Sequence, residues 1–299
     1  MEHLTLGWVL LAGTLFSTSA TNSKRELDAI KEVAMDMALD SFDDRYQGCS
    51  HMMEKELEEL NHTEFTNSVY AEGWRNAIME WRNRWGRAAH PQGLRLQQAL
   101  AVLAYTAEGD LYRAFNQAVR EGGRSRQHYL RFFPFKTLHF LLTEALRALR
   151  EAQGSRCHRV YRGTKGIRFT ARRQQTVRFG QFTSSSLQKK VAQSFGQDTF
   201  FSVDTCYSIP IKEFSFYPHE DEVLIPPFEA FKVTNFTRDR GGTIIELRSQ
   251  AVHSTYNCEL VKEKRCQDQP CIFSAGRSSP GEPPHLWGLL AAAALAAVG

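Results

Sequence analysis

The spacing of the apolar residues changes near residue 155, and this change restricts the folds that the chain can adopt. Over residues 27–150 the apolar residues recur at helical intervals, which predicts helices. Over residues 157–250 they lie in short stretches rich in aromatic and β-branched residues, which is typical of strands. Helices followed by strands predict an α+β protein rather than a doubly wound parallel sheet.

The mainly stranded part is divided into short elements. One helix is expected among the strands, over residues 187–195. No Gly-x-Gly-x-x-Gly follows a strand, which argues against a Rossmann site for a dinucleotide. The expected strands cover residues 160–163, 176–182, 199–203, 223–225, 229–236 and 243–247.

Both ends of the chain have the composition of processing signals. An apolar run followed by small residues up to Ala20 predicts a signal peptide over 1–20, with a short buried helix as the alternative. At the other end, a polar spacer and an uncharged tail follow Ser274-Ala275-Gly276. This is the pattern of a glycosylphosphatidylinositol (GPI) anchor signal over 274–299, with plain secretion as the alternative. Either route gives an extracellular protein.

Six cysteines agree with an extracellular compartment, where an even number indicates disulfides. Six cysteines allow 15 pairings, and the sequence alone selects none of them. N-glycosylation sequons at Asn61 and Asn235 predict surface positions. Cys-x-x-Cys and His-Glu-x-x-His patterns are absent from the sequence, so no bound metal is expected. The formal net charge of +4 is too small to predict nucleic-acid binding.

Three tryptophans of the helical part, Trp74, Trp81 and Trp85, lie seven and four residues apart. This spacing places them on one side of a helix, where an aromatic stripe is more often core than a ligand cage. We therefore expect these side chains to pack in the helical core.

Three consecutive acids, Glu220, Asp221 and Glu222, precede an apolar segment and are candidates for chemistry. In an extended strand Glu220 and Glu222 share one face and Asp221 points away. Repulsion between two carboxylates raises the cost of ionising both, which keeps one available for proton chemistry. The alternative is a solvated acidic turn that leads into a core strand.

Two more patterns precede this triplet along the chain. Arg162 ends an expected strand and is followed by Gly163, which would let the backbone approach a ligand closely. An arginine there suits a phosphate, because its planar guanidinium donates two parallel hydrogen bonds. A later expected strand ends in four hydroxyl residues, Thr183 to Ser186, just before the expected helix. Their alternative role is helix capping.

An arginine, an aromatic-Thr-Ser-Ser-Ser segment and Glu-x-Glu, in this order and each at a strand, form a specific combination. The chain here resembles the arginine-specific ecto-mono-ADP-ribosyltransferases, that is, NAD(P)+–protein-arginine ADP-ribosyltransferases. The resemblance extends from about Tyr105 to Cys271, over more than half of the chain. The matching segments are Phe135-Lys-Thr-Leu-His-Phe140, Tyr161-Arg-Gly163, Phe182-Thr-Ser-Ser-Ser186 and Glu220-x-Glu222-Val-Leu-Ile-Pro226.

This resemblance implies an enzyme that transfers ADP-ribose from NAD to arginine side chains of proteins and releases nicotinamide. It implies Arg162, Ser184 and Glu222 as the catalytic set, and Glu220 as the residue that directs transfer to arginine. NAD is then the co-substrate, and the reaction requires no metal. The residues implied to contact NAD are Tyr105, Arg162, Gly163, Gln181 and Ser215.

The resemblance also implies a fold and its covalent links. The catalytic domain is expected over 21–273, with the helical part packed on a two-sheet β core. Disulfides are implied between Cys49 and Cys258 and between Cys157 and Cys206. Cys266 and Cys271 then remain as a candidate local pair.

Two other functions stay open at this point. An NAD glycohydrolase uses water in place of arginine, and a non-catalytic surface binding module keeps the fold without turnover. The expected partners are NAD and extracellular or cell-surface proteins that expose an arginine. A monomer held at the membrane by a lipid anchor is expected.

Overall fold

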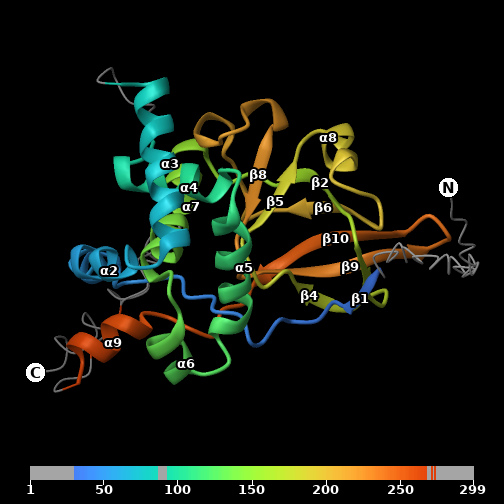
Figure 1. Ribbon diagram of the computed structural model, residues 1–299. Helices are drawn as coiled ribbons and strands as arrows, with labels where there is room; N and C mark the ends of the chain where they lie inside the picture. The colour runs from blue at the N-terminus through green and yellow to red at the C-terminus, as the bar shows by residue number, and fades with distance from the viewer. Residues whose placement is uncertain (1–29, 87–92, 268–270, 272, 274–299) are drawn as a thin grey trace, which may run out of the picture.

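A computed structural model of the protein describes residues 30–86, 93–267, 271 and 273 (Figure 1). Helices of the first half gather on one side of the molecule, and the strands form a sheet on the other side (Figure 1). The expected α+β class, with helices before strands, is confirmed. The expected signal peptide over 1–20 and anchor signal over 274–299 lie outside the described residues. In the part of the chain that is described, no helix is long and apolar enough to cross a membrane.

The helical part packs around one apolar core. Trp74 and Trp81 lie in that core, as their spacing predicts, and Trp85 packs against it. The central helix is α7, whose residues 136–146 are all buried. The helices of this part are α1 (Ser50–Glu54), α2 (Leu57–Glu64), α3 (Ser68–Arg84), α4 (Leu96–Thr106), α5 (Asp110–Gly122), α6 (Arg126–Phe132) and α7 (Lys136–Gln153).

The first turn of α7 is capped by a side chain from another helix. The Glu64 carboxylate, at the end of α2, accepts hydrogen bonds from the main-chain N–H of Lys136 at 2.5 Å and of Thr137 at 3.0 Å. Burial raises the pKa of Glu64 to about 7. A carboxylate at a helix N-terminus satisfies main-chain donors that have no partner within the helix.

The main sheet has the strand order β4-β9-β10-β6-β2-β5-β8-β7. One residue pair, Tyr161 with Ser186, joins β2 to β5, so the sheet divides almost completely into two parts. This division agrees with the expected two-sheet core. The strands are β2 (His158–Thr164), β4 (Thr176–Arg178), β5 (Thr183–Ser186), β6 (Thr199–Thr205), β7 (Ile209–Pro210), β8 (Glu222–Ile225), β9 (Glu229–Arg238) and β10 (Thr243–Val252).

The first described residues differ from the expected helix that begins at residue 27. Lys31–Ala34 forms a strand, β1, which pairs in parallel with β3 (Ile167–Thr170) as a separate two-stranded sheet. Met35 then packs among the apolar residues of the main sheet. The expectation of a helix here is wrong, because a distant strand supplies the hydrogen-bond partners.

The disulfides Cys49–Cys258, Cys157–Cys206 and Cys266–Cys271 are all present, which confirms the pairing that the resemblance implied. The first one joins the start of α1 to the start of α9 (Glu259–Arg265). Beside it, the buried Asp44 carboxylate accepts hydrogen bonds from the main-chain N–H of Cys258 and of Glu259, at 2.8 and 3.0 Å. The far end of the chain is therefore held against the helical part.

Candidate active site

The acidic triplet does not form one continuous strand. Glu220 ends a 3-10 turn, η2 (Pro218–Glu220), Asp221 adopts the left-handed conformation with φ 44° and ψ 51°, and Glu222 begins β8. The expectation that strand alternation places Glu220 and Glu222 on one face is therefore wrong. A turn brings the two carboxylates close enough to interact, because the charge of Glu220 adds to the effect of burial in raising the pKa of Glu222.

Asp221 interacts with a different set of residues. Its carboxylate accepts hydrogen bonds from Lys212 Nζ at 2.5 Å and from Gln188 Nε2. The hydrogen bond from Lys212 lowers the pKa of Asp221. These two bonds hold the turn, since left-handed backbone is unfavourable for a residue other than glycine unless its surroundings fix it.

Glu222 is a buried carboxylate with hydroxyl donors around it. The side chain is 6% exposed, and Oε2 accepts a hydrogen bond from Ser215 Oγ at 2.8 Å. Burial raises the pKa of Glu222, while hydrogen bonding from Ser184 and Ser215 and the charge of Arg162 act in the opposite direction. These donors and this cation favour the ionised form, which burial alone disfavours.

The loop that carries Ser215 is fixed by helices of the first half. Ser215 is fully buried, and its hydroxyl also accepts a hydrogen bond from the main-chain N–H of Tyr217 at 3.1 Å. Arg84, at the end of α3, donates to the main-chain oxygens of Ser215 at 2.6 Å and of Phe216 at 2.9 Å. The N–H of Phe216 donates to Thr106 Oγ1 at 3.0 Å. The hydroxyl that holds Glu222 thus depends on α3 and α4.

Arg162, in β2, faces the same region. Its Nη1 donates to the main-chain oxygen of Ser184 at 2.6 Å, across the junction between β2 and β5. Burial opposes the charge of Arg162, but the surrounding Tyr112, Tyr105 and Glu222 outweigh it and raise the pKa of the guanidinium. The cation is therefore held beside the catalytic candidates and stays charged.

The four hydroxyl residues are a strand of the sheet, and only Ser186 contacts the start of α8 (Lys189–Ser194), where its Oγ accepts a hydrogen bond from the main-chain N–H of Gln188 at 2.9 Å. Thr183–Ser186 forms β5, while α8 has Gln188 at its N-cap and no side-chain cap hydrogen bond. Ser185 Oγ donates to Val223 O at 2.7 Å, and Ser186 Oγ donates to Glu220 O at 2.6 Å. The hydroxyls tie β5 to the acidic segment.

Comparison with known proteins assigns this arrangement to a family. Residues 35–255, well over half of the chain, match the family model described as NAD:arginine ADP-ribosyltransferase. The chain belongs to this family.

Relatives of this transferase match it over nearly their whole length. The erythroblast NAD(P)(+)–arginine ADP-ribosyltransferase of Gallus gallus is 63% identical over 278 residues, which cover 93% of this chain and 92% of that relative. The GPI-linked NAD(P)(+)–arginine ADP-ribosyltransferase 1 of Homo sapiens is 47% identical over 307 residues, which cover 97% and 93%.

Solved structures agree with the fold of the transferase. The crystal structure of the eukaryotic mono-ADP-ribosyltransferase ART2.2 is similar to it with a TM-score of 0.65 and 38% sequence identity. The match covers 76% of this chain and 98% of that chain. A mutant of ART2.2 has been solved in complex with NAD.

Gly163 of the transferase allows a close packing contact within the protein. A Cβ added there would lie 2.2 Å from the main-chain oxygen of Ala192 and 2.3 Å from that of Gly196. The backbone that approaches Gly163 closely is therefore the α8 segment, and the glycine allows this segment to pack on β2.

The remaining residues that the resemblance implied lie around this centre. Tyr105 is fully buried, and its hydroxyl donates to Phe182 O at 2.9 Å and accepts from Asn116 Nδ2 at 3.2 Å. Burial raises the pKa of Tyr105 well above its ordinary value. Gln181 is partly exposed, and its side-chain oxygen accepts a hydrogen bond from Arg120.

Sequence reasoning missed the residues that support the centre from the helical part. Arg84 holds the Ser215 loop, and Tyr112 hydrogen-bonds to Arg162. Neither lies in a recognisable motif, because each acts through a contact between distant segments. Across the described ranges, no group of three or more His, Cys, Asp or Glu side chains is arranged to hold a metal ion.

Proposed function

We propose that this chain transfers ADP-ribose from NAD to arginine side chains of proteins and releases nicotinamide, which is the reaction that names its family. One observation carries the assignment to a site. A buried carboxylate, Glu222, lies within the influence of a cation, two hydroxyls and a second, more exposed carboxylate. Family membership alone does not identify the residues that act, so their roles are proposed here.

Glu222 is proposed to stabilise the reacting ribose. When the bond between nicotinamide and the ribose C1′ breaks, the electron pair leaves with nicotinamide and positive charge develops on the sugar. A fixed anion at that point stabilises the charge, and its effect is large where water is excluded. Ser215 and Ser184 support this role, since their hydroxyls hydrogen-bond to the Glu222 carboxylate and favour its ionised form.

Arg162 is proposed to bind the pyrophosphate of NAD. It is charged and partly buried, and its remaining N–H groups can donate to phosphate oxygens. Gln181 is exposed enough for a direct contact with NAD. Tyr105, Ser215 and Gly163 have no such surface, because all three are buried. We assign these three residues to the support of Arg162, Ser184 and Glu222.

Glu220 is proposed to receive the arginine of the acceptor protein. Its side chain is partly exposed at the end of η2, while Glu222 is buried at the start of β8. Burial raises the pKa of Glu220, which makes it a better proton acceptor. A guanidinium is normally charged, so a carboxylate beside it both holds the group and takes a proton as the guanidine nitrogen bonds to C1′.

Incubation with labelled NAD and a small guanidino acceptor tests this function. Labelled acceptor in excess over free ADP-ribose supports a transferase. Free ADP-ribose alone identifies an NAD glycohydrolase, and the absence of both products identifies a binding module without turnover. The pair of carboxylates favours transfer, because hydrolysis has no guanidinium to bind.

We also propose that the catalytic domain covers 21–273 and acts at the cell surface as a monomer. The processing of 1–20 as a signal peptide and of 274–299 as an anchor signal agrees with relatives named GPI-linked. Three disulfides agree with an oxidising compartment. The proposed acceptors are cell-surface or extracellular proteins that expose an arginine.

A further inference from the structure

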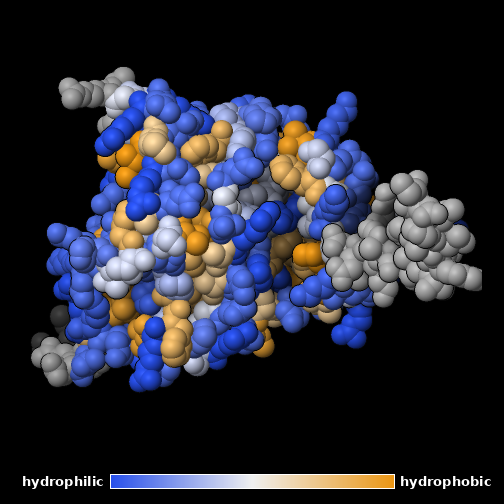
Figure 2. Space-filling model, viewed as in Figure 1, coloured by the Kyte–Doolittle hydropathy of each residue, from blue (hydrophilic) through white to orange (hydrophobic). Residues whose placement is uncertain are grey.

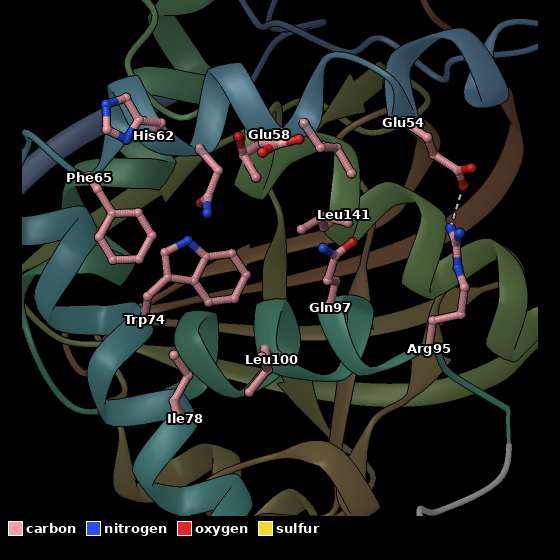
Figure 3. Close-up of a pocket in the computed structure, with 13 residues that line it drawn as sticks. Glu54, Glu58, His62, Phe65, Trp74, Ile78, Arg95, Gln97, Leu100 and Leu141 are labelled. Atoms are coloured by element: carbon pink, nitrogen blue, oxygen red, sulfur yellow. Dashed lines mark hydrogen bonds and ion pairs between the residues drawn. The ribbon is translucent and has the colours of Figure 1, made fainter.

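A cavity of about 920 Å³ lies in the helical part, away from the residues of the candidate active site (Figure 3). One wall is α2, the opposite wall is formed by α3 and α4, and Leu141 of α7 lies between them (Figure 3). We call this cavity the α2–α4 groove. Its volume is within the range of ~300–1,000 Å³ that is common for small-molecule sites.

The lining of the groove combines aromatic side chains with polar ones. Phe65 and Trp74 present their rings to it, and Glu58 and His62 lie along its α2 side (Figure 3). Trp74 is 5% exposed; burial raises the pKa of the neighbouring Tyr70, and a hydrogen bond from the Trp74 indole N–H acts in the opposite direction and lowers it. Phe65 is the more exposed of the two rings, so it offers the groove most of its aromatic surface.

Asn61 also lines the groove, and it is the acceptor position of the sequon Asn61-His62-Thr63. Its side-chain oxygen accepts a hydrogen bond from the hydroxyl of the buried Tyr70 at 2.7 Å. Its side-chain nitrogen makes no hydrogen bond to the described part of the chain. The amide is therefore held through its oxygen, and the nitrogen, the atom that N-glycosylation modifies, remains available.

We propose that Asn61 carries an N-linked glycan and that the first N-acetylglucosamine of this glycan lies in the α2–α4 groove. The modification forms a bond between the sugar C1 and Asn61 Nδ2. It breaks the C1–O bond to a lipid pyrophosphate donor, which leaves with the electron pair, and Nδ2 loses one proton. It occurs on the unfolded chain during secretion, so the partial burial of Asn61 in the fold is no obstacle.

The groove matches the chemistry of this sugar. The C–H groups on the faces of the sugar ring pack on aromatic rings, and the partly exposed Phe65 provides such a ring. The sugar hydroxyls can donate to the carboxylate of Glu58, which lines the groove. A sugar attached to α2 and seated here contacts α3 as well, so the glycan links two helices.

The second sequon provides a control within the same chain. Asn235 lies in β9, and its side-chain oxygen accepts a hydrogen bond from Arg173 at 2.6 Å. It does not line the α2–α4 groove. A glycan on Asn235 is therefore expected to extend into solvent.

Native deglycosylation with mass spectrometry of the full secreted chain tests the proposal. Peptide analysis first determines whether Asn61 is modified; an unmodified Asn61 overturns the proposal. The release rate by a peptide N-glycosidase is then measured at each site in the folded and the denatured protein. We expect folding to slow release at Asn61 by at least about tenfold, because release requires local opening. An equal rate of glycan release at Asn61 in the folded and the denatured protein contradicts the placement of the sugar in the groove.

Two substitutions at Thr63 distinguish the effect of the glycan on stability from the effect of the Asn61 side chain. Thr63→Ala removes the sequon but leaves Asn61 and its bond to Tyr70, and we expect it to lower the thermal midpoint. Thr63→Ser keeps the sequon and a hydroxyl that can donate to Glu59 O, as Thr63 does at 2.9 Å, so it should match the native protein. Equal thermal midpoints for the native protein and Thr63→Ala would show that the glycan makes no stabilising contact. That result would contradict the placement of the sugar in the groove.

Discussion

Arg84 holds the main-chain oxygen of Ser215 at 2.6 Å, across the boundary between the helical part and the sheet. Ser215 in turn donates its hydroxyl to the Glu222 carboxylate at 2.8 Å. A residue at the end of α3 thus determines the position of a hydrogen bond to the proposed catalytic carboxylate. Figure 2 shows hydrophobic residues interspersed among hydrophilic ones over the helical part of the molecule.

Arg84→Gln is expected to reduce kcat by about tenfold while the KM for NAD changes less, because a displaced Ser215 weakens the positioning of Glu222. The hydrogen bond from Ser215 lowers the pKa of Glu222, so its loss raises that pKa. The acid limb of the pH–rate profile should then move to higher pH, as it should in Ser215→Ala. Arg82→Gln, at an exposed position on the same helix, is the control. Lower activity with an unmoved acid limb would contradict a positioning role.

Glu222→Gln and Glu220→Gln are expected to have different effects on transfer and on hydrolysis. Glu222 acts on the charged ribose, through which both reactions pass, so its substitution should reduce both by roughly a hundredfold or more. Glu220 acts on the guanidinium, which only transfer needs, so slow NAD hydrolysis should persist in its variant. Both products are assayed on both variants. An equal loss of the two activities in Glu220→Gln would show that the roles are assigned incorrectly.

Glu64→Gln is expected to change how stability depends on pH. Burial raises the pKa of Glu64 from 4.5 to about 7 in the folded state. The folded protein therefore keeps this proton after the unfolded chain has lost it, and stability falls as the pH rises from about 4.5 to about 7. The variant has no such proton and keeps one oxygen to cap α7.

Denaturant unfolding at pH 4.5 and pH 7 checks this sign. The native protein should lose more stability than Glu64→Gln between the two values, by about 2 kcal/mol. Asp44 also has a raised pKa, of about 6, but it is present in both proteins and cancels in the comparison. A steeper loss in the variant would mean that ionised Glu64 is stabilised by the N-terminus of α7 more than burial destabilises it.

Removal of the disulfide Cys49–Cys258 should cost much more stability than removal of Cys266–Cys271. The sequence separations are 209 and 5 residues. In the chain-entropy model the paired Cys→Ser variants lose about 5 and about 2 kcal/mol respectively. Unfolding in guanidinium chloride measures both. Similar losses would indicate that the unfolded chain is already compact near Cys49 and Cys258.

Cells that display the full chain should release it when they are treated with a phosphatidylinositol-specific phospholipase. The proposed anchor signal over 274–299 would be replaced by a lipid, which this enzyme cleaves. Immunoblots of the medium and of the cells before and after treatment measure the release. Protein that stays on the cells, or that reaches the medium untreated, would contradict the anchor.

Much of the fold could be predicted because it rests on local pattern. The interval between apolar residues over 27–150 predicted that the first half is helical, and Trp74 and Trp81 pack in the core as expected. The positions on the buried face of a helix or strand recur at a regular interval, so a short stretch of sequence is enough to predict them. The strand β1 was missed because its partner, β3, lies far along the chain.

For the candidate site, the order of the motifs and the family resemblance proposed Arg162, Ser184, Glu220 and Glu222, and their roles stay predictions. Only the tertiary structure decided how these side chains are held. Asp221 turns the backbone between the two glutamates, and Arg84 reaches Ser215 across 131 positions of sequence. The physical reason is that a hydrogen bond between distant segments depends on how whole elements pack. The spacing of residues within one helix or strand does not predict how that element packs against another.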